Sequence, residues 1–121
     1  MNSNRIMAVL LGVWLVVGWP AVSLAHVHME RSIPEDGAHL KQAPDRIQLW
    51  FSGKVAGEWS KVIVTDAKGQ RVDDGNVANG DDPSVLEVGL KPLSSGVYDV
   101  KLNVISGDGH RVKGSLSFTV D

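Results

Sequence analysis

The sequence predicts an all-β domain, a Greek-key sandwich or small barrel, preceded by a secretory signal. Three observations point to this class. Short segments alternate between apolar and polar residues, which is the period of a half-buried strand. Clusters of Gly, Pro and Asp separate these segments at regular spacing, as turns do between antiparallel strands. No segment keeps a helical period over three turns.

The beginning of the chain has the pattern of a secretory signal peptide. Arg5 supplies a positive charge, residues 6–19 are apolar, and small residues precede and include Ala25. A membrane-spanning helix needs ~20 apolar residues, more than this core contains, so cleavage is favoured over an uncleaved anchor. We therefore expect residues 1–25 to be removed and residues 26–121 to form one exported domain.

The first half of that domain holds three predicted strands. Residues 27–33 form the first, ahead of a turn at residues 34–37. Residues 46–52 and 61–65 follow with the same alternation. The third strand leads into a tight turn at residues 66–69, where a glycine stands at the position that needs a positive φ.

The second half begins with a polar stretch, residues 73–83, which is rich in Asp, Asn and Gly and has no apolar period. We expect it to be mostly loop, with at most a short edge strand. Three further alternating segments close the domain: residues 85–90, 97–105 and 116–120. Tyr98 follows Gly96 at the start of a strand, which resembles the tyrosine corner of immunoglobulin-like sandwiches. An isolated strand tyrosine is the alternative.

Composition narrows the function. The 96 residues after the signal suffice for one small domain and no more. In this part 11 basic residues face 14 acidic ones, a net charge of −3, which argues against a nucleic-acid partner. The absence of cysteine excludes disulfides, thiolate metal sites and cysteine nucleophiles. Only Met29 remains as a thioether, too little to hold a soft ion such as Cu(I).

The residue that cleavage would expose is His26. An N-terminal histidine offers its α-amine and its Nδ1 atom, which together close a chelate ring around a metal ion. No internal histidine can do this. His28, two residues further along an extended strand, would share the same face, whereas His39 is expected to be a solvated loop histidine.

A second candidate lies in the turn Asp108-Gly109-His110, between the last two predicted strands. Glycines at 107 and 109 allow the carboxylate and the imidazole to point the same way. The motif is weak alone, because aspartate commonly caps turns and surface histidines are usually only solvated. Joined to His26, it gives three nitrogens and one oxygen, a set suited to tetragonal Cu(II).

At this point the chain resembles the CopC family of periplasmic copper-binding proteins. The resemblance covers the whole mature domain and rests on these segments: His26-Val27-His28, Ser32-Ile33-Pro34 with Asp36-Gly37, residues 47–52 (IQLWFS), residues 93–98 (LSSGVY), residues 104–110 (VISGDGH), Gly114 and residues 117–120 (SFTV).

The resemblance implies a seven-stranded, immunoglobulin-like Greek-key sandwich that binds Cu(II) at one end. The ligand roles map to His26, Asp108 and His110, and His28 either approaches the ion or lies beside the site. Some family members carry a methionine-rich loop for Cu(I). This chain lacks one, so we expect it to hold Cu(II) only.

These observations support three candidate functions. The leading one is a monomeric periplasmic carrier or buffer of Cu(II), serving copper resistance, homeostasis or uptake. It would deliver the ion to an inner-membrane importer or another periplasmic copper protein, with no catalytic cycle. Its affinity should fall in acid, because imidazole and amine ligands lose their protons near pH values of roughly 6.5 and 7.7.

The second is a copper monooxygenase with a histidine brace, as in lytic polysaccharide monooxygenases. Such an enzyme needs a flat aromatic face and an open copper position. Trp50 and Trp59 are the only tryptophans after the signal, and Asp108 as a ligand would fill the coordination plane. The third is a metal-free immunoglobulin-like module, which would leave the position of His26 behind the cleavage site as coincidence.

Overall fold

The computed structural model describes residues 26–121, together with the isolated positions Gly12 and Gly18. The predicted signal peptide and the bond after Ala25 lie outside the described domain. Within the described residues, no helix is long and apolar enough to cross a membrane.

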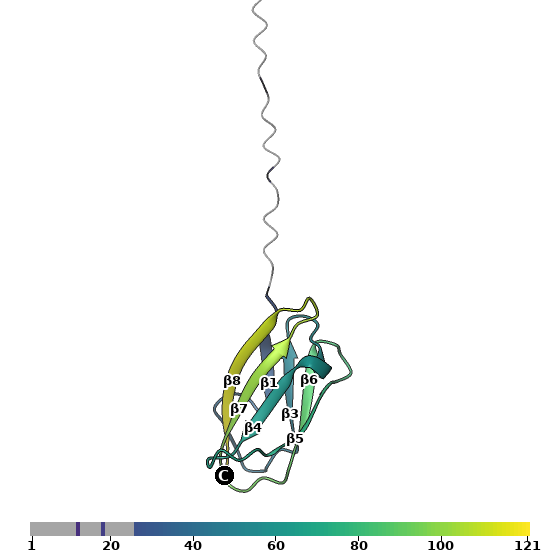
Figure 1. The fold of residues 1–121 in the computed structure, drawn as a ribbon. Coiled ribbons are helices and arrows are strands. Elements are labelled where there is room, and N and C mark those ends of the chain that lie inside the picture. The colour runs from purple at the N-terminus through teal and green to yellow at the C-terminus, as the bar shows by residue number, and fades with distance from the viewer. Residues whose placement is uncertain (1–11, 13–17, 19–25) are drawn as a thin grey trace, which may run out of the picture.

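Two four-stranded sheets make up the domain (Figure 1). One sheet has the order β1 (Met29–Ile33), β3 (Arg46–Phe51), β6 (Val85–Leu90), β5 (Asp73–Asn79). The other has the order β2 (Ala38–Leu40), β8 (Arg111–Val120), β7 (Gly96–Ile105), β4 (Lys61–Thr65). Only β5–β6 and β7–β8 are neighbours in both sequence and sheet, so the other connections cross between sheets, as in Greek-key sandwiches. The all-β fold class is confirmed.

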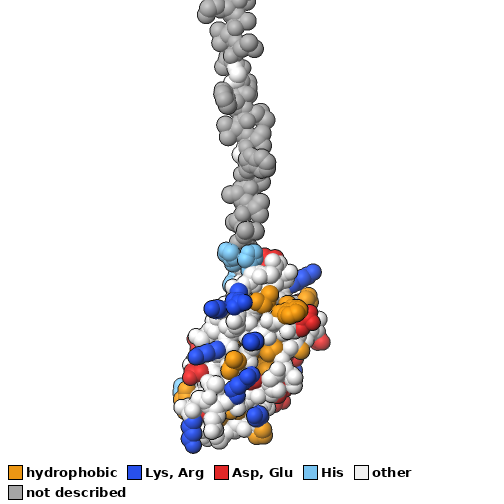
Figure 2. Space-filling model, viewed as in Figure 1, with side chains coloured by type: hydrophobic (Ala, Val, Ile, Leu, Met, Phe, Trp, Pro, Cys, Tyr) orange, Lys and Arg blue, Asp and Glu red, His pale blue; other side chains and the backbone are white. Residues whose placement is uncertain are grey.

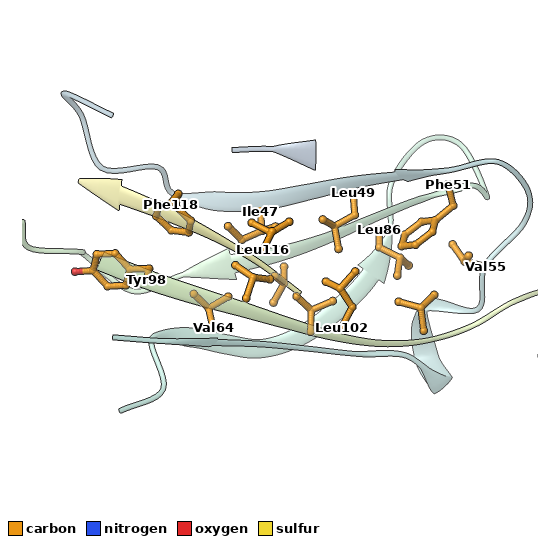
Figure 3. Packing of buried hydrophobic residues seen from close by; sticks show 14 of the residues in the cluster. Ile47, Leu49, Phe51, Val55, Val64, Leu86, Tyr98, Leu102, Leu116 and Phe118 are labelled. Carbon is orange, nitrogen blue, oxygen red and sulfur yellow. The ribbon is translucent and has the colours of Figure 1, made fainter. Parts of the chain in front are cut away.

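The core lies between the sheets and is filled by inward-facing apolar side chains (Figure 3). In β3 the predicted alternation is confirmed, because Ile47, Leu49 and Phe51 are buried while the residues between them are partly exposed. Tyr98 stacks on Phe118 with ring centroids 5.4 Å apart. Its hydroxyl donates to the Ser94 carbonyl oxygen at 2.6 Å. The tyrosine corner is thus confirmed.

Three elements differ from the predictions. Among the described residues there are eight strands rather than seven, because β2 adds a three-residue strand parallel to β8. The polar stretch that was expected to be mostly loop contains the seven-residue edge strand β5. Its pairing with β6 shifts register between Asp73 and Val77, where Gly75 has a φ of 75°. β8 starts at Arg111, directly after the predicted turn, and is thus longer than the alternating segment 116–120, because its pairing with β7 continues to the turn.

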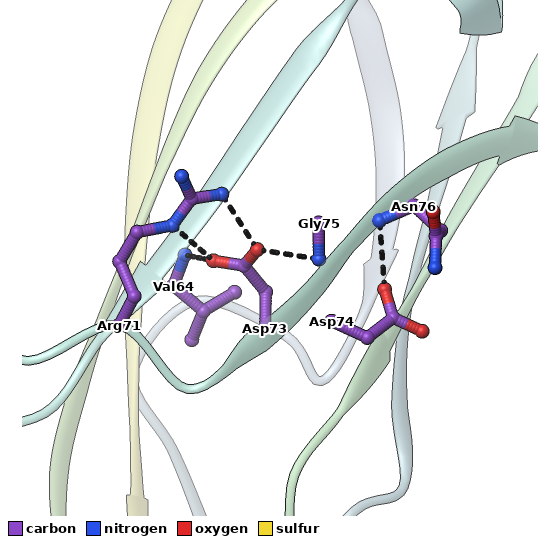
Figure 4. Close-up of polar contacts among 6 residues, drawn as sticks. All are labelled: Val64, Arg71, Asp73, Asp74, Gly75 and Asn76. Atoms are coloured by element: carbon purple, nitrogen blue, oxygen red, sulfur yellow. Dashed lines mark hydrogen bonds and ion pairs between the residues drawn. The ribbon is translucent and has the colours of Figure 1, made fainter.

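A buried carboxylate joins the two sheets (Figure 4). The Asp73 side chain is 0% exposed. Its Oδ2 accepts from the Val64 amide of β4 at 2.9 Å and from Arg71 Nε at 3.2 Å. Its Oδ1 accepts from Arg71 Nη2 at 2.7 Å and from the Gly75 amide at 2.9 Å. Burial raises the pKa of Asp73, but the bonds from Arg71, Val64 and Gly75 outweigh burial and leave the pKa lowered.

Candidate metal site

The β7–β8 hairpin turn lies at the end of the sandwich where residue 26 enters the domain (Figure 1). The Ser106 amide donates to the His110 carbonyl oxygen at 2.8 Å, and the Gly109 amide donates to the Ser106 carbonyl oxygen at 2.9 Å. Gly109 has a φ of 87°, which L side chains rarely adopt. The predicted turn is therefore present, and glycine is needed at its apex.

Asp108 and His110 form a pair within this turn. Oδ2 of Asp108 lies 2.9 Å from Nδ1 of His110, and the two side chains are 58% and 54% exposed. The bond from the Ser106 hydroxyl, followed by that from His110, lowers the pKa of Asp108 to about 2. Because the carboxylate occupies Nδ1, Nε2 is the ring nitrogen of His110 that remains for a metal ion. A carboxylate in this position orients a ligating imidazole and makes it more basic.

Ser106 supports both members of the pair, and sequence reasoning missed it. It is 2% exposed. Its hydroxyl donates to Asp108 Oδ1, and its Oγ accepts from the His110 amide at 3.0 Å. The available signal was the spacing Ser-x-Asp-x-His, because a serine hydroxyl commonly bonds groups two to four residues away.

The structure brings His26 to this pair. The His26 and His110 rings meet edge to face, with centroids 5.8 Å apart and planes at 88°. Before cleavage, the backbone nitrogen of His26 is an amide bonded to Ala25. Within the described residues, no group of three His, Asp or Glu side chains is arranged to hold a metal ion. His26, Asp108 and His110 are therefore neighbours, but in the described residues their side chains are not arranged as a three-ligand site.

The other two histidines lie differently. Nδ1 of His28 is 3.5 Å from the His26 carbonyl oxygen, and the backbone of His28 exchanges hydrogen bonds with Ser52. His28 thus lies beside the candidate site. His39 is solvated as expected, but it belongs to strand β2 rather than to a loop, and its Nδ1 is 3.6 Å from Asp121 Oδ1. It pairs with Thr119, so most of β8 separates it from the site.

A neighbouring loop braces the turn. The Gly107 amide donates to the Lys54 carbonyl oxygen, and the Ala56 amide donates to that of Ile105, both at 2.8 Å. This loop leads into the short 3-10 helix η1 (Gly57–Trp59), whose Trp59 is 70% exposed.

The two tryptophans after the predicted signal lie on different elements. Trp50 is half-buried on β3, beneath the Arg31 guanidinium, which lies 4.7 Å from its ring centroid. Trp59 is the last residue of η1.

Residues 29–121 match the CopC domain family, and the chain belongs to that family. The match includes Asp108 and His110, and it begins after His26 and His28. The matched residues include all eight strands of the two-sheet sandwich described above.

Among curated relatives, "Copper transport protein CutJ" of Bacillus subtilis is 32% identical over 99% of this chain, although the chain spans only 22% of that protein's length. "Copper resistance protein C" of Escherichia coli is 33% identical over 88% of this chain and 90% of its own length.

Solved structures of CopC and PcoC are also similar to this domain. CopC from Methylosinus trichosporium OB3b superposes with a TM-score of 0.74 and 32% identity, covering 79% of this chain and 94% of the other. PcoC from Escherichia coli, described as a methionine-rich copper resistance protein, has a TM-score of 0.70 and 31% identity, covering 80% and 100%.

Proposed function

We propose that the protein matures by cleavage after Ala25 and acts in the periplasm as a Cu(II) carrier or buffer in copper resistance, homeostasis or uptake. Membership of the CopC domain family and the names of the relatives support a copper role. The observation that carries the proposal is the meeting of the His26 ring with the paired Asp108 and His110, 5.8 Å between imidazole centroids.

The proposed ligands are the amine and Nδ1 of His26, Nε2 of His110 and a carboxylate oxygen of Asp108. Three nitrogens and one oxygen suit tetragonal Cu(II). Asp108 serves first by holding His110, and it becomes a direct ligand if Oδ2 leaves Nδ1 for the ion. His28 is the fifth candidate, positioned beside His26. Ser106 holds the turn in register for both roles.

Cu(II) is favoured over Cu(I) because soft ligands are scarce. Residues 26–121 contain one methionine, the half-buried Met29, and no cysteine. The Escherichia coli structure, by contrast, is described as methionine-rich. Cu(I) prefers thioether and thiolate ligands, so one oxidation state is expected to be bound here.

The copper ion is cargo in this proposal, and the protein is a monomer that performs no reaction. Its partner would be an inner-membrane importer or another periplasmic copper protein. The separated tryptophans argue against the monooxygenase alternative, which needs a broad aromatic binding face. Oxidation of a polysaccharide by the copper-loaded protein with ascorbate would restore that alternative.

The test is a Cu(II) titration of the protein that begins at His26, compared with the same protein whose N-terminal amine is acetylated. The first should bind one equivalent of Cu(II) more tightly, because acetylation turns the amine into an amide and removes it from the chelate ring. His39→Ala is the matched control and should bind like the unaltered protein. Equal affinity with and without the acetyl group would refute the proposal, and a mass spectrum of exported protein checks the cleavage site.

A further inference from the structure

One outer face of the domain is strongly basic. We call Lys61, Lys101, Arg111 and Lys113 the basic face. They are exposed residues of β4, β7 and β8, and Figure 2 shows Lys and Arg side chains gathered over these strands. Strand register places them together on one surface. Lys61 and Lys113 both pair with Asn103, and Lys101 lies two residues before Asn103 on the same side of β7.

These cations have no anionic partner in the described part of the chain. The ion pairs found there involve other basic residues, and none of the four donates a side-chain hydrogen bond to a carboxylate. Asp99 is the one acidic residue that shares the outward side of β4, β7 and β8. It lies two residues further than Lys101 from the hairpin turn.

The opposite sheet is built differently. There Arg46 lies 3.7 Å from Glu87, and Arg31 lies over Trp50. Its cations are thus engaged within the molecule, although the domain as a whole carries a net charge of −3. Among the residues of the strands, the positive charge without an ion pair or an aromatic partner lies on one sheet, which is an arrangement that can steer a complementary surface.

The basic face adjoins the candidate metal site. Arg111 directly follows His110, and Lys61 pairs with Asn103, two residues before β7 ends. A macromolecule seated on this face would therefore lie next to the β7–β8 turn. This juxtaposition matters because a partner that takes copper must approach that end of the sandwich.

We propose that the basic face docks an acidic surface on the protein that exchanges copper with this one. The inference rests on the proposed function. A protein fits better than an anionic bilayer, because peripheral membrane binding usually adds apolar side chains to basic ones. Two isoleucines share the outward side of these strands, Ile63 beside Lys101 and Ile105 beside Arg111, but both are half-buried. Of the exposed large apolar side chains of the described residues, Ile33 lies on the other sheet and Val97 at the far end of β7, and Trp59 lies on η1, two residues before Lys61.

Poly-L-glutamate is the probe, measured by fluorescence anisotropy with the protein that begins at His26. The test variant is the triple reversal Lys61→Glu, Lys101→Glu, Lys113→Glu. The matched control is Lys41→Glu, Lys68→Glu, Lys91→Glu, which changes the net charge equally at three exposed lysines away from this face. Arg111 is left unchanged because it borders His110.

The test variant should bind poly-L-glutamate about tenfold more weakly than the control variant, from a few exposed charge pairs of ~0.2–1 kcal/mol each. The difference should shrink as salt rises. Equal weakening of both variants would overturn the proposal, as would binding to phosphatidylglycerol vesicles without binding to poly-L-glutamate. Thermal unfolding confirms that both variants fold. A Cu(II) titration separates the docking proposal from the proposed function. The test variant should keep its copper affinity. Failure of the unaltered protein to bind Cu(II) would refute the proposed function and would leave the binding of an acidic surface to be judged by the anisotropy measurement.

Discussion

Two aspartates of this domain have similar contacts and opposite surroundings. Asp73 and Asp108 each accept hydrogen bonds from a basic side chain and a backbone amide, and the pKa of each is lowered. Yet the Asp73 side chain is 0% exposed, whereas that of Asp108 is 58% exposed. The first joins two sheets, and the second stands beside two histidines at one end.

Burial, more than bonding pattern, distinguishes the two carboxylates, and under the proposed function it separates a structural aspartate from one that supports a metal ligand. A buried, fully bonded carboxylate has no free oxygen and cannot lose a partner cheaply. An exposed one can exchange a hydrogen bond for a metal ion at little cost. Three predictions test this division.

The largest effect is expected from Asp73→Ala. It leaves the amides of Val64 and Gly75 and the Arg71 guanidinium without their acceptor, and should lower the free energy of unfolding by about 3 kcal/mol. Urea unfolding measures this loss. Asp74→Ala is the control, because Asp74 is exposed and bonds only the Asn76 amide, so its loss should cost well under about 1 kcal/mol. Equal destabilisation by both variants would contradict the structural role of Asp73.

Asp108→Asn should act on copper instead. It removes the charge that holds Nδ1 of His110, and Cu(II) affinity should fall about 10–100-fold, the range for losing a group that orients a ligand. Stability at neutral pH should fall by less than in Asp73→Ala, because the Asp108 side chain is exposed and its contacts are screened by solvent. Calorimetric titration measures the affinity, and Asp99→Asn, another exposed aspartate, should leave it unaltered.

The electron paramagnetic resonance spectrum of the Cu(II)-loaded variant separates the two roles of Asp108. A changed spectrum means that its oxygen is a ligand, and an unchanged spectrum with weaker binding means that it acts through His110. Unchanged affinity would remove Asp108 from the site.

The sequence predicts the features that depend on local pattern. Alternation in β3, the tyrosine corner at Tyr98 and the turn at Asp108–His110 all follow from neighbouring residues, and the structure has them. The full length of β5 is not predicted, because an edge strand that faces solvent needs no apolar period. β2 is not predicted, because its three residues form a strand only by pairing with β8, which is far away in the sequence.

The candidate site likewise has one part that the sequence predicts and another part that depends on the folded chain. The residue types of His26, Asp108 and His110 can be predicted, since chelation by an N-terminal histidine is a matter of covalent chemistry. The contact of Asp108 with Nδ1 of His110, and the support of both by buried Ser106, depend on the folded turn. Sequence spacing alone does not specify which oxygen faces which nitrogen.

The smallest expected effect is on acid stability, and it follows from the lowered pKa of both aspartates. A lowered pKa in the folded state means that the unfolded chain binds more protons. The contribution of these aspartates to the free energy of unfolding should therefore be constant above the unfolded pKa near about 4 and should decline as the pH falls below it, toward about 2 for Asp108. Urea unfolding at pH 6, 4 and 3 measures the decline, which should be shallower in Asp73→Asn and in Asp108→Asn than in the unaltered protein.

Salt then distinguishes the two carboxylates. The contribution of exposed Asp108 should fade in ~0.5 M salt, because surface charges are screened, whereas that of buried Asp73 should persist. If Asp108→Asn still flattened the pH profile in high salt while Asp73→Asn no longer did, burial would not be what divides the two. A parallel decline in all three proteins would show that other carboxylates govern acid unfolding. The expected pattern would instead mean that Asp73 holds the two sheets together. Asp108 would then be the carboxylate that can exchange its hydrogen-bond partner for copper.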